Sequence, residues 1–217
     1  MATAPVSTID RLDVRPFDDS HVGSVVRWVG SADELRWLAP STDWPLTVEK
    51  VRAWRRGGGG SYGLYLGDRA EPIGHGELNP MRANPSQLWM GHIIVAPSHR
   101  RLGFGRRFVT ELARVAFERY HAERLILVVF PSNTTALNCY MATGFRTVGE
   151  EFHVIGHATT DRPPRRHRLI RLNQGRGKHN PRHVHRPRLL LCQKLKRIRL
   201  LRHKHRSGFH LIRPPQL

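Results

Sequence analysis

Residues 95–105 read VAPSHRRLGFG and connect an apolar segment to an amphipathic one. The preceding residues, Trp89–Val95, are apolar and β-branched enough for a buried strand, and Pro97 ends strand pairing because it has no backbone N–H. From Gly105 to Tyr120 apolar side chains recur at helical spacing; they are Phe108, Leu112, Val115 and Ala116. The sequence therefore predicts a strand, a tight turn and a helix in direct succession.

The predicted turn is suited to binding phosphate. Gly103 and Gly105 have no Cβ, so a diphosphate can approach the free N–H groups of the first helical turn, where the helix dipole favours negative charge. Arg100 and Arg101 add positive charge. Two better-known phosphate loops do not fit, because one needs a glycine at Phe108 and the other a Gly-Lys-Ser/Thr ending. An ordinary strand-to-helix turn is the alternative on these residues alone.

A second segment makes the pattern more specific. An apolar run at residues 125–130 is followed by Asn133-Thr134-Thr135-Ala136-Leu137-Asn138-Cys139-Tyr140, which leads to Gly144-Phe145. Together the two segments resemble motifs A and B of the GNAT superfamily of N-acetyltransferases. The motifs are Arg/Gln-x-x-Gly-x-Gly/Ala, followed by Asn-x-x-Ala-x-x-x-Tyr and Gly-Phe. In layout the resemblance extends over residues 11–154, and its specific part lies within residues 95–145.

The resemblance implies an α/β fold: a GNAT-like three-layer sandwich whose mixed antiparallel and parallel sheet contains one βαβ crossover. The residue patterns agree with this fold. They predict strands near residues 11–17, 61–66, 73–78, 89–95 and 125–130, and a last strand after Phe145. They predict helices after Asp18 or Asp19, at 31–38, 47–56 and 105–120, and from Asn133. We expect one N-acetyltransferase domain over residues 9–160.

The resemblance also implies that acetyl-CoA is the cosubstrate and lies where the fourth and fifth strands part. The backbone of Ile94, Val95 and Pro97 is then expected to face the pantetheine arm. The N–H groups expected around the diphosphate belong to Arg101, Leu102, Gly103, Phe104, Gly105 and Arg106, with Arg100 beside them. Asn133 has two compatible roles, since its amide can cap the helix or hydrogen-bond the cofactor.

Tyr140 is the candidate catalytic residue. In the implied reaction a neutral primary amine attacks the thioester carbonyl, a strand amide stabilises the oxyanion, and the departing thiolate needs a proton. The pKa of a phenol, near 10, is slightly higher than the pKa of a thiol, about 8.5, so a tyrosine can supply that proton. A tyrosine whose ring merely fills the core is the alternative.

The base of the reaction is not assigned by the sequence. Related enzymes carry a glutamate where Trp89 or Val128 aligns, and neither position holds a carboxylate. Glu77 and His92 are substitutes that could pass a proton through water, although each also fits a structural role.

The acceptor is expected to be a primary amine of a small molecule, a protein N-terminus or a lysine. Four tryptophans precede residue 60 on the predicted acceptor side: Trp28, Trp37, Trp44 and Trp54. If they line the site, a small or amphipathic amine fits better than a lysine-rich peptide, whose recognition calls for acids. A coenzyme A-binding module without turnover is an alternative function.

Charge divides the chain into two regions. Residues 1–161 hold 18 Lys and Arg against 17 Asp and Glu, whereas residues 162–217 hold 18 Lys and Arg and no acid. Residues 162–217 are therefore predicted to be a disordered basic tail. The tail has three interpretations: a nucleic-acid-binding arm, a contact with anionic membrane, or a non-adaptive extension from a shifted reading frame.

Other features exclude several classes of protein. Two cysteines make no disulfide framework, and no apolar run approaches the roughly 20 residues that span a bilayer. The histidine pairs near residues 183–185 and 203–205 lack nearby carboxylates, so no metal is expected. These features predict a cytoplasmic protein without membrane insertion.

Overall fold

The computed structural model describes residues 12–55, 59–155 and 165–175 of the 217-residue chain. The strands are β1 (Leu12–Pro16), β2 (Gly60–Leu66), β3 (Gly74–Met81), β4 (Asn84–Val95), β5 (Arg124–Val129), β6 (Arg146–Ile155) and β7 (Arg165–Gly175). The helices are η1 (Asp19–His21), α1 (Val22–Trp28), α2 (Ala32–Leu38), α3 (Val48–Trp54), η2 (Pro97–His99), α4 (Phe104–Glu118) and α5 (Thr134–Ala142).

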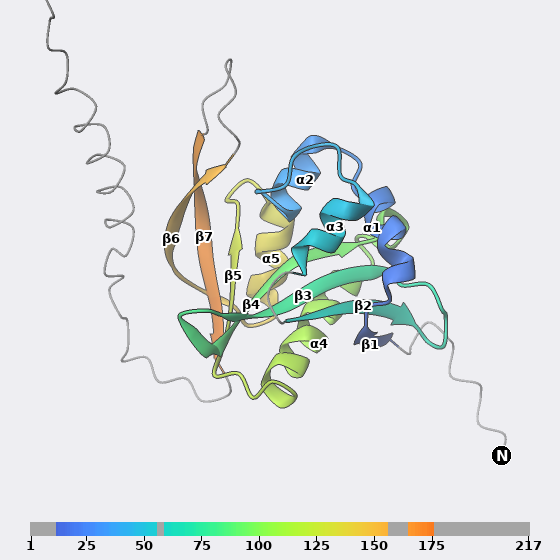
Figure 1. The fold of residues 1–217 in the computed structure, drawn as a ribbon. Coiled ribbons are helices and arrows are strands. Elements are labelled where there is room, and N and C mark those ends of the chain that lie inside the picture. The colour runs from blue at the N-terminus through green and yellow to red at the C-terminus, as the bar shows by residue number, and fades with distance from the viewer. Residues whose placement is uncertain (1–11, 56–58, 156–164, 176–217) are drawn as a thin grey trace, which may run out of the picture. The chain divides into compact units, whose positions relative to one another are not determined.

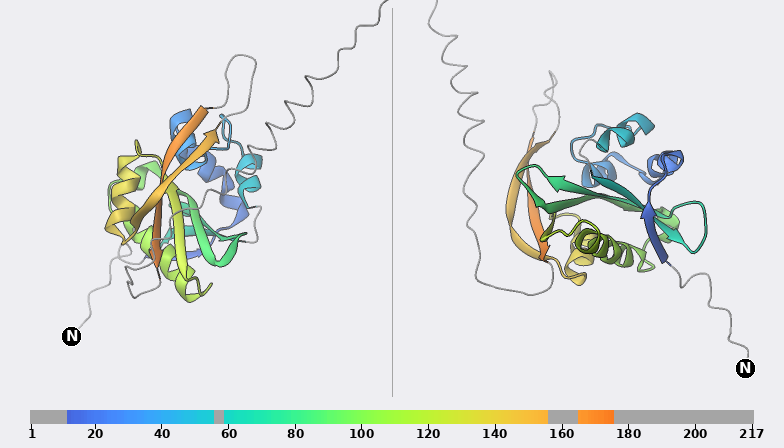
Figure 2. Two further views of the ribbon diagram at one scale, coloured as in Figure 1. Left: turned by 90° about the vertical axis from the view of Figure 1, so that its left-hand side faces the viewer. Right: turned by 60° about the horizontal axis from the view of Figure 1, so that its bottom comes forward.

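The strands form one mixed sheet in the order β1-β2-β3-β4-β5-β7-β6. β4 and β5 run parallel, joined through α4 in a βαβ crossover, and the other paired neighbours run antiparallel. The helices α1 to α3 lie on one face of the sheet, and α4 and α5 lie on the other (Figures 1 and 2). The three-layer α/β sandwich predicted from the sequence is confirmed.

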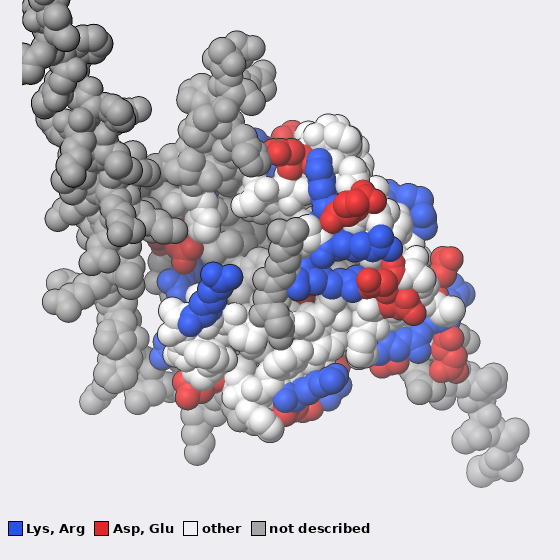
Figure 3. All heavy atoms as spheres, in the orientation of Figure 1, with Lys and Arg blue, Asp and Glu red and all other residues white. Residues whose placement is uncertain are grey.

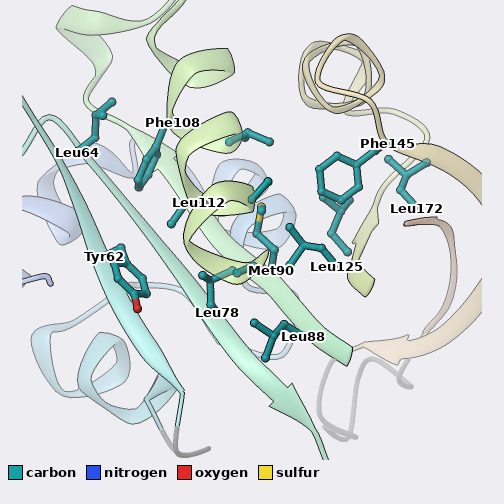
Figure 4. Packing of buried hydrophobic residues seen from close by; sticks show 14 of the residues in the cluster. Tyr62, Leu64, Leu78, Leu88, Met90, Phe108, Leu112, Leu125, Phe145 and Leu172 are labelled. Carbon is teal, nitrogen blue, oxygen red and sulfur yellow. The ribbon is translucent and has the colours of Figure 1, made fainter. Parts of the chain in front are cut away.

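Each face of the sheet has its own apolar cluster. On the α4 face, Phe108 and Leu112 pack toward Leu64, Leu78 and Met90 of the central strands (Figure 4). On the other face, side chains of α1 to α3 pack against the end of β4; the buried members include Val22, Val25, Trp28, Leu35, Val51, Ile94 and Ala96. Alternate residues of β4 thus serve opposite faces, as strand geometry requires.

The first helices begin at side-chain caps. The Asp18 carboxylate accepts from Ser20 N–H, the Ser31 hydroxyl from Glu34 N–H, and the Thr47 hydroxyl from Lys50 N–H. Each cap satisfies a donor that a helix start would otherwise leave open. The predicted starts at Asp18, Ser31 and Thr47 are confirmed.

The predicted end of the domain at residue 160 is wrong, because residues 165–175 form β7. This strand pairs with β5 along one edge and with β6 along the other. Leu169 and Leu172 are buried in it, while Arg168 and Arg171 pair with carboxylates of β6. The prediction of a disordered tail from residue 162 therefore fails for β7, and residues 176–217 lie outside the described part.

Among the described residues, no helix has both the length and the apolar composition needed to cross a bilayer.

Leu172→Ala is expected to lower the free energy of unfolding by about 2–5 kcal/mol, because it removes a fully buried side chain from the core. Arg168→Ala, on the same strand but exposed, is the matched control and should cost no more than about 1 kcal/mol. Urea denaturation of the full chain measures both. Equal, small losses would show that β7 does not belong to the cooperative core.

Candidate active site

The site begins where β4 and β5 part. Their parallel pairing covers three residues of β4, from Gln87 to Trp89, and ends there. Between Gly91 and Ile94 the pairing with β3 also shifts by one residue, which marks a β-bulge in β4. His92 lies in this bulge with a positive φ of 49°. The side of β4 facing β5 from Met90 to Val95 is therefore free of β5, and we call it the open edge.

Val95 directs its backbone toward the open edge. Ala96 N–H donates to Ile73 O at 2.8 Å, and Ile94 O lies 3.2 Å from where a Cβ of Gly74 would stand, so both residues bond toward β3. Because backbone groups alternate along a strand, Val95 N–H points the other way. Of the three residues predicted to face a pantetheine arm, the geometry favours Val95 over Ile94, and Pro97 is exposed in η2.

Six successive amides lie open just after β4. The N–H groups of residues 101–106 hydrogen-bond to none of the described residues, and α4 has no side-chain cap. In the turn that exposes them, the backbone is left-handed at Arg101 (φ 63°) and at Gly103 (φ 83°). A glycine such as Gly103 adopts this conformation without strain. Open donors at a helix start, with the helix dipole behind them, form an anion site.

Gly105 leaves room beside these amides. A Cβ there would lie 4.0 Å from both Cys139 Sγ and Val95 Cγ2, which is ordinary contact distance. The protein's own packing therefore does not demand glycine at this position. This space is compatible with the approach of a ligand, which is what the motif implies.

Arg100 hydrogen-bonds to the turn and to the helices beside it. Its guanidinium donates to Val95 O at 2.9 Å, Trp28 O at 2.9 Å and Glu34 Oε1 at 2.6 Å. Burial raises the pKa of Glu34, but hydrogen bonds from Gly30 N–H and Arg100 outweigh this and hold it below its usual value. Arg100 thus anchors the turn to α1 and α2, and its place beside the diphosphate stays a prediction.

Tyr140 lies on α5 with its ring against the core and its hydroxyl free. The ring meets Phe145 edge-on at 6.0 Å. The side chain is half-buried, and its hydroxyl, which bonds to none of the described residues, keeps contact with solvent. Burial raises the pKa of the Tyr140 phenol. The group therefore stays protonated through the neutral range, as a proton donor must.

Asn133 acts as a helix cap. Its Oδ1 accepts from Ala136 N–H at 3.2 Å, which begins α5. Its side-chain NH₂ makes no hydrogen bond with a described residue, so the second predicted role stays a prediction.

A buried polar cluster, which we call the bulge cluster, lies beside the open edge on the α1–α3 face. Its members are Ser61, His75, Glu77, Asn79 and His92. Glu77 Oε2 accepts from His92 Nδ1 and from Asn79 Nδ2, both at 3.1 Å, while Glu77 Oε1 is buried without a described partner. Sequence reasoning named Glu77 and His92 separately; their pairing required the bulge, which no sequence pattern showed.

The four tryptophans predicted on the acceptor side do not line one common surface. Trp28 is buried in the core, and Trp37 and Trp44 are 39% and 50% exposed. Trp54 stacks on His92 with ring centroids 4.3 Å apart and donates to the Thr42 hydroxyl at 2.9 Å. Trp89, which the prediction did not include, meets His92 edge-on at 5.1 Å. The indole rings in contact with His92 are therefore those of Trp54 and Trp89, while Phe17 packs against His75.

The comparison with protein families agrees with this geometry. Residues 30–145 match the model of the acetyltransferase (GNAT) family. The chain belongs to this family. Its members are acetyltransferases, so the chain is an acyltransferase with acetyl-CoA as cosubstrate. The open amides, the open edge and the space at Gly105 fit that cosubstrate.

Solved structures share the fold of this GNAT chain. A spermidine N-acetyltransferase from Vibrio cholerae, in complex with CoA and spermine, has a TM-score of 0.62 at 15% identity, covering 76% of this chain and 96% of that one. A putative phosphinothricin N-acetyltransferase scores 0.60 at 17% identity, with 77% and 100% covered. An aminoglycoside acetyltransferase in complex with coenzyme A and kanamycin scores 0.58 at 17% identity, with 76% and 95% covered.

Glu34→Gln separates the two roles of Arg100 in this GNAT domain. As an anchor, Arg100 loses its charged partner, so we expect unfolding to cost about 0.5–1.5 kcal/mol less and the Kd for acetyl-CoA to rise about two- to fivefold. If Arg100 instead binds the diphosphate, the loss of the Glu34 charge frees its guanidinium, and the Kd for acetyl-CoA should fall. Calorimetric titration measures the Kd, with Asp33→Asn, an exposed neighbour, as the control.

Proposed function

We propose that the chain is an acetyl-CoA-dependent N-acetyltransferase that acylates the primary amine of a small molecule by direct attack on the thioester. The observation that carries this proposal is the run of open amides at residues 101–106, next to the free N–H of Val95 on the open edge. The amides hold the diphosphate of acetyl-CoA, and the open edge receives the pantetheine arm as an added strand.

Two groups of the chain act on the reacting atoms. The Val95 N–H is the strand amide best placed to donate to the oxyanion that forms on the thioester carbonyl. The Tyr140 hydroxyl donates its proton to the departing thiolate. Its protonated state at neutral pH and its lack of a described partner support this role.

A small amine is favoured over a lysine-rich peptide. On the described surface seen in Figure 3, Lys and Arg alternate with Asp and Glu, and no broad acidic patch suited to a basic peptide stands out. Trp54 and Trp89 offer aromatic faces that attract a cationic amine. The structural relatives include enzymes solved with spermine and with kanamycin, which are small polyamines.

Tyr140→Phe is expected to lower kcat about 100-fold or more while leaving the Kd for acetyl-CoA unchanged, because it removes a proton donor and keeps the ring. Thiol release measures the rate, and calorimetry measures the Kd. Tyr120→Phe, which removes a hydroxyl bonded to Tyr62 at 2.8 Å, is the matched control and should keep full activity. An unchanged rate in Tyr140→Phe would remove the phenol from the mechanism.

An amine panel tests the function itself. We expect thiol release with spermidine or an aminoglycoside to exceed that with a lysine-containing peptide by at least about tenfold in kcat/KM. Acetyl-CoA binding without thiol release to any amine would instead favour the binding module. Binding of nucleic acid, measured over a series of salt concentrations, tests the basic residues 176–217 separately.

A further inference from the structure

The bulge cluster contains a histidine and a carboxylate arranged as a proton-accepting pair. Its members lie next to the open edge, where the proposed reaction takes place. We propose that His92 Nε2 takes the proton from the incoming amine and that Glu77 is a positioning residue that fixes the imidazole and compensates its charge. This inference rests on the proposed N-acetyltransferase function.

The hydrogen bond to Glu77 determines which imidazole nitrogen is free. Burial raises the pKa of Glu77, but the hydrogen bond and charge of His92 outweigh this and keep it below its usual value. The carboxylate is therefore ionised and can only accept, so His92 Nδ1 carries the hydrogen of the 3.1 Å bond. Nε2 then holds a lone pair, as a general base requires.

Of the three titratable groups in the cluster, His92 is the one that a substrate can reach. Glu77 and His75 are buried, with 1% and 0% of the residue surface exposed. Both nitrogens of His75 are used, by Ser61 Oγ at 2.8 Å and His92 O at 3.2 Å. His92 is 15% exposed, and its Nε2, which bonds to no described residue, keeps contact with solvent.

The backbone and two rings hold His92 in place. Its positive φ is a backbone conformation that histidine adopts rarely, and such outliers gather at functional sites. His75 supports the bulge from behind through its bond to His92 O. Trp54 stacks on the imidazole and Trp89 lies nearly perpendicular to it, so both indole rings restrict the orientation of the imidazole.

Three titratable or charged groups lie around His92: Glu77, His75 and Arg55. Glu77 on β3 is in direct contact with it. Burial lowers the pKa of His75 to about 4, so that ring is neutral at pH 7. Arg55, at the end of α3, pairs with Asp19 near Phe17 and His75. Glu77 is therefore the charge that acts on His92 directly.

The proton balance closes with groups already named. The amine enters as an ammonium ion and gives one proton to His92 Nε2. Its freed lone pair attacks the thioester carbon, the C–N bond forms and the C–S bond breaks. Tyr140 gives its proton to the sulfur and regains the proton that the nitrogen loses. His92 then releases its proton to solvent, so each turnover yields an amide, a thiol and one proton.

The first test replaces the base. His92→Asn is chosen because asparagine tolerates positive φ. We expect kcat/KM at pH 7.5 to fall about 100-fold with the best amine of the panel, with the Kd for acetyl-CoA unchanged. His153→Asn breaks a similar but exposed pair, with Glu151 at 3.0 Å on β6, and should retain full activity. Full activity and an unchanged pH profile in His92→Asn would overturn the inference and leave the proposed function standing.

The second test replaces the positioning residue. In Glu77→Gln the imidazolium loses its carboxylate, so the acidic limb of the kcat/KM profile should move to lower pH, which a purely structural role would not cause. Nitrogen-15 NMR of the wild type should show hydrogen on Nδ1 and none on Nε2 of neutral His92. Hydrogen on Nε2 would overturn the inference without any reference to activity. Absence of acetyl transfer to every amine would overturn the proposed function, and the role of His92 with it.

Discussion

The structure depends on β4 pairing fully with only one of its neighbours. Three residues of β4 pair with β5, and then the bulge at His92 turns the strand away. An unpaired strand edge is costly inside a protein, because each open N–H and C=O needs a partner. In the proposed function an extended ligand arm supplies those partners, so the irregularity that interrupts the sheet is also the proposed place for the cosubstrate.

The bulge also determines what lies on the opposite side of the open edge. Without the extra residue, His92 and Glu77 would not meet, since residue pairs on a regular ladder keep a fixed register. The shift brings an imidazole, a buried carboxylate and two indole rings together on the α1–α3 face. The proposed cosubstrate contacts and the proposed proton transfer therefore both depend on the bulge in β4.

The sequence predicted the elements whose physics is local. Helix caps at Ser31 and Thr47, the glycine turn at Gly103 and the helix from Asn133 follow from neighbouring residues, and the structure has them. The pairing of Glu77 with His92 and the engagement of Arg100 by Glu34 join residues far apart in the chain, so no local pattern carried them. The sequence analysis missed β7 because its arginines gave the segment the composition of a disordered tail, although Leu169 and Leu172 are buried. Its arginines pair with carboxylates of the neighbouring strand, so a high positive charge did not predict disorder there.

The position of β7 connects the far end of the sheet to Tyr140, the proposed proton donor. Among the described strands, β6 pairs with β7 alone. The two strands are therefore attached to the rest of the sheet by the pairing of β7 with β5. Gln174 of β7 donates to Thr143 O, at the end of the helix that carries Tyr140. Local opening of these two strands would loosen this helix. The orientation of the proton donor is thus shared between its own helix and a strand that composition alone assigns to a dispensable extension.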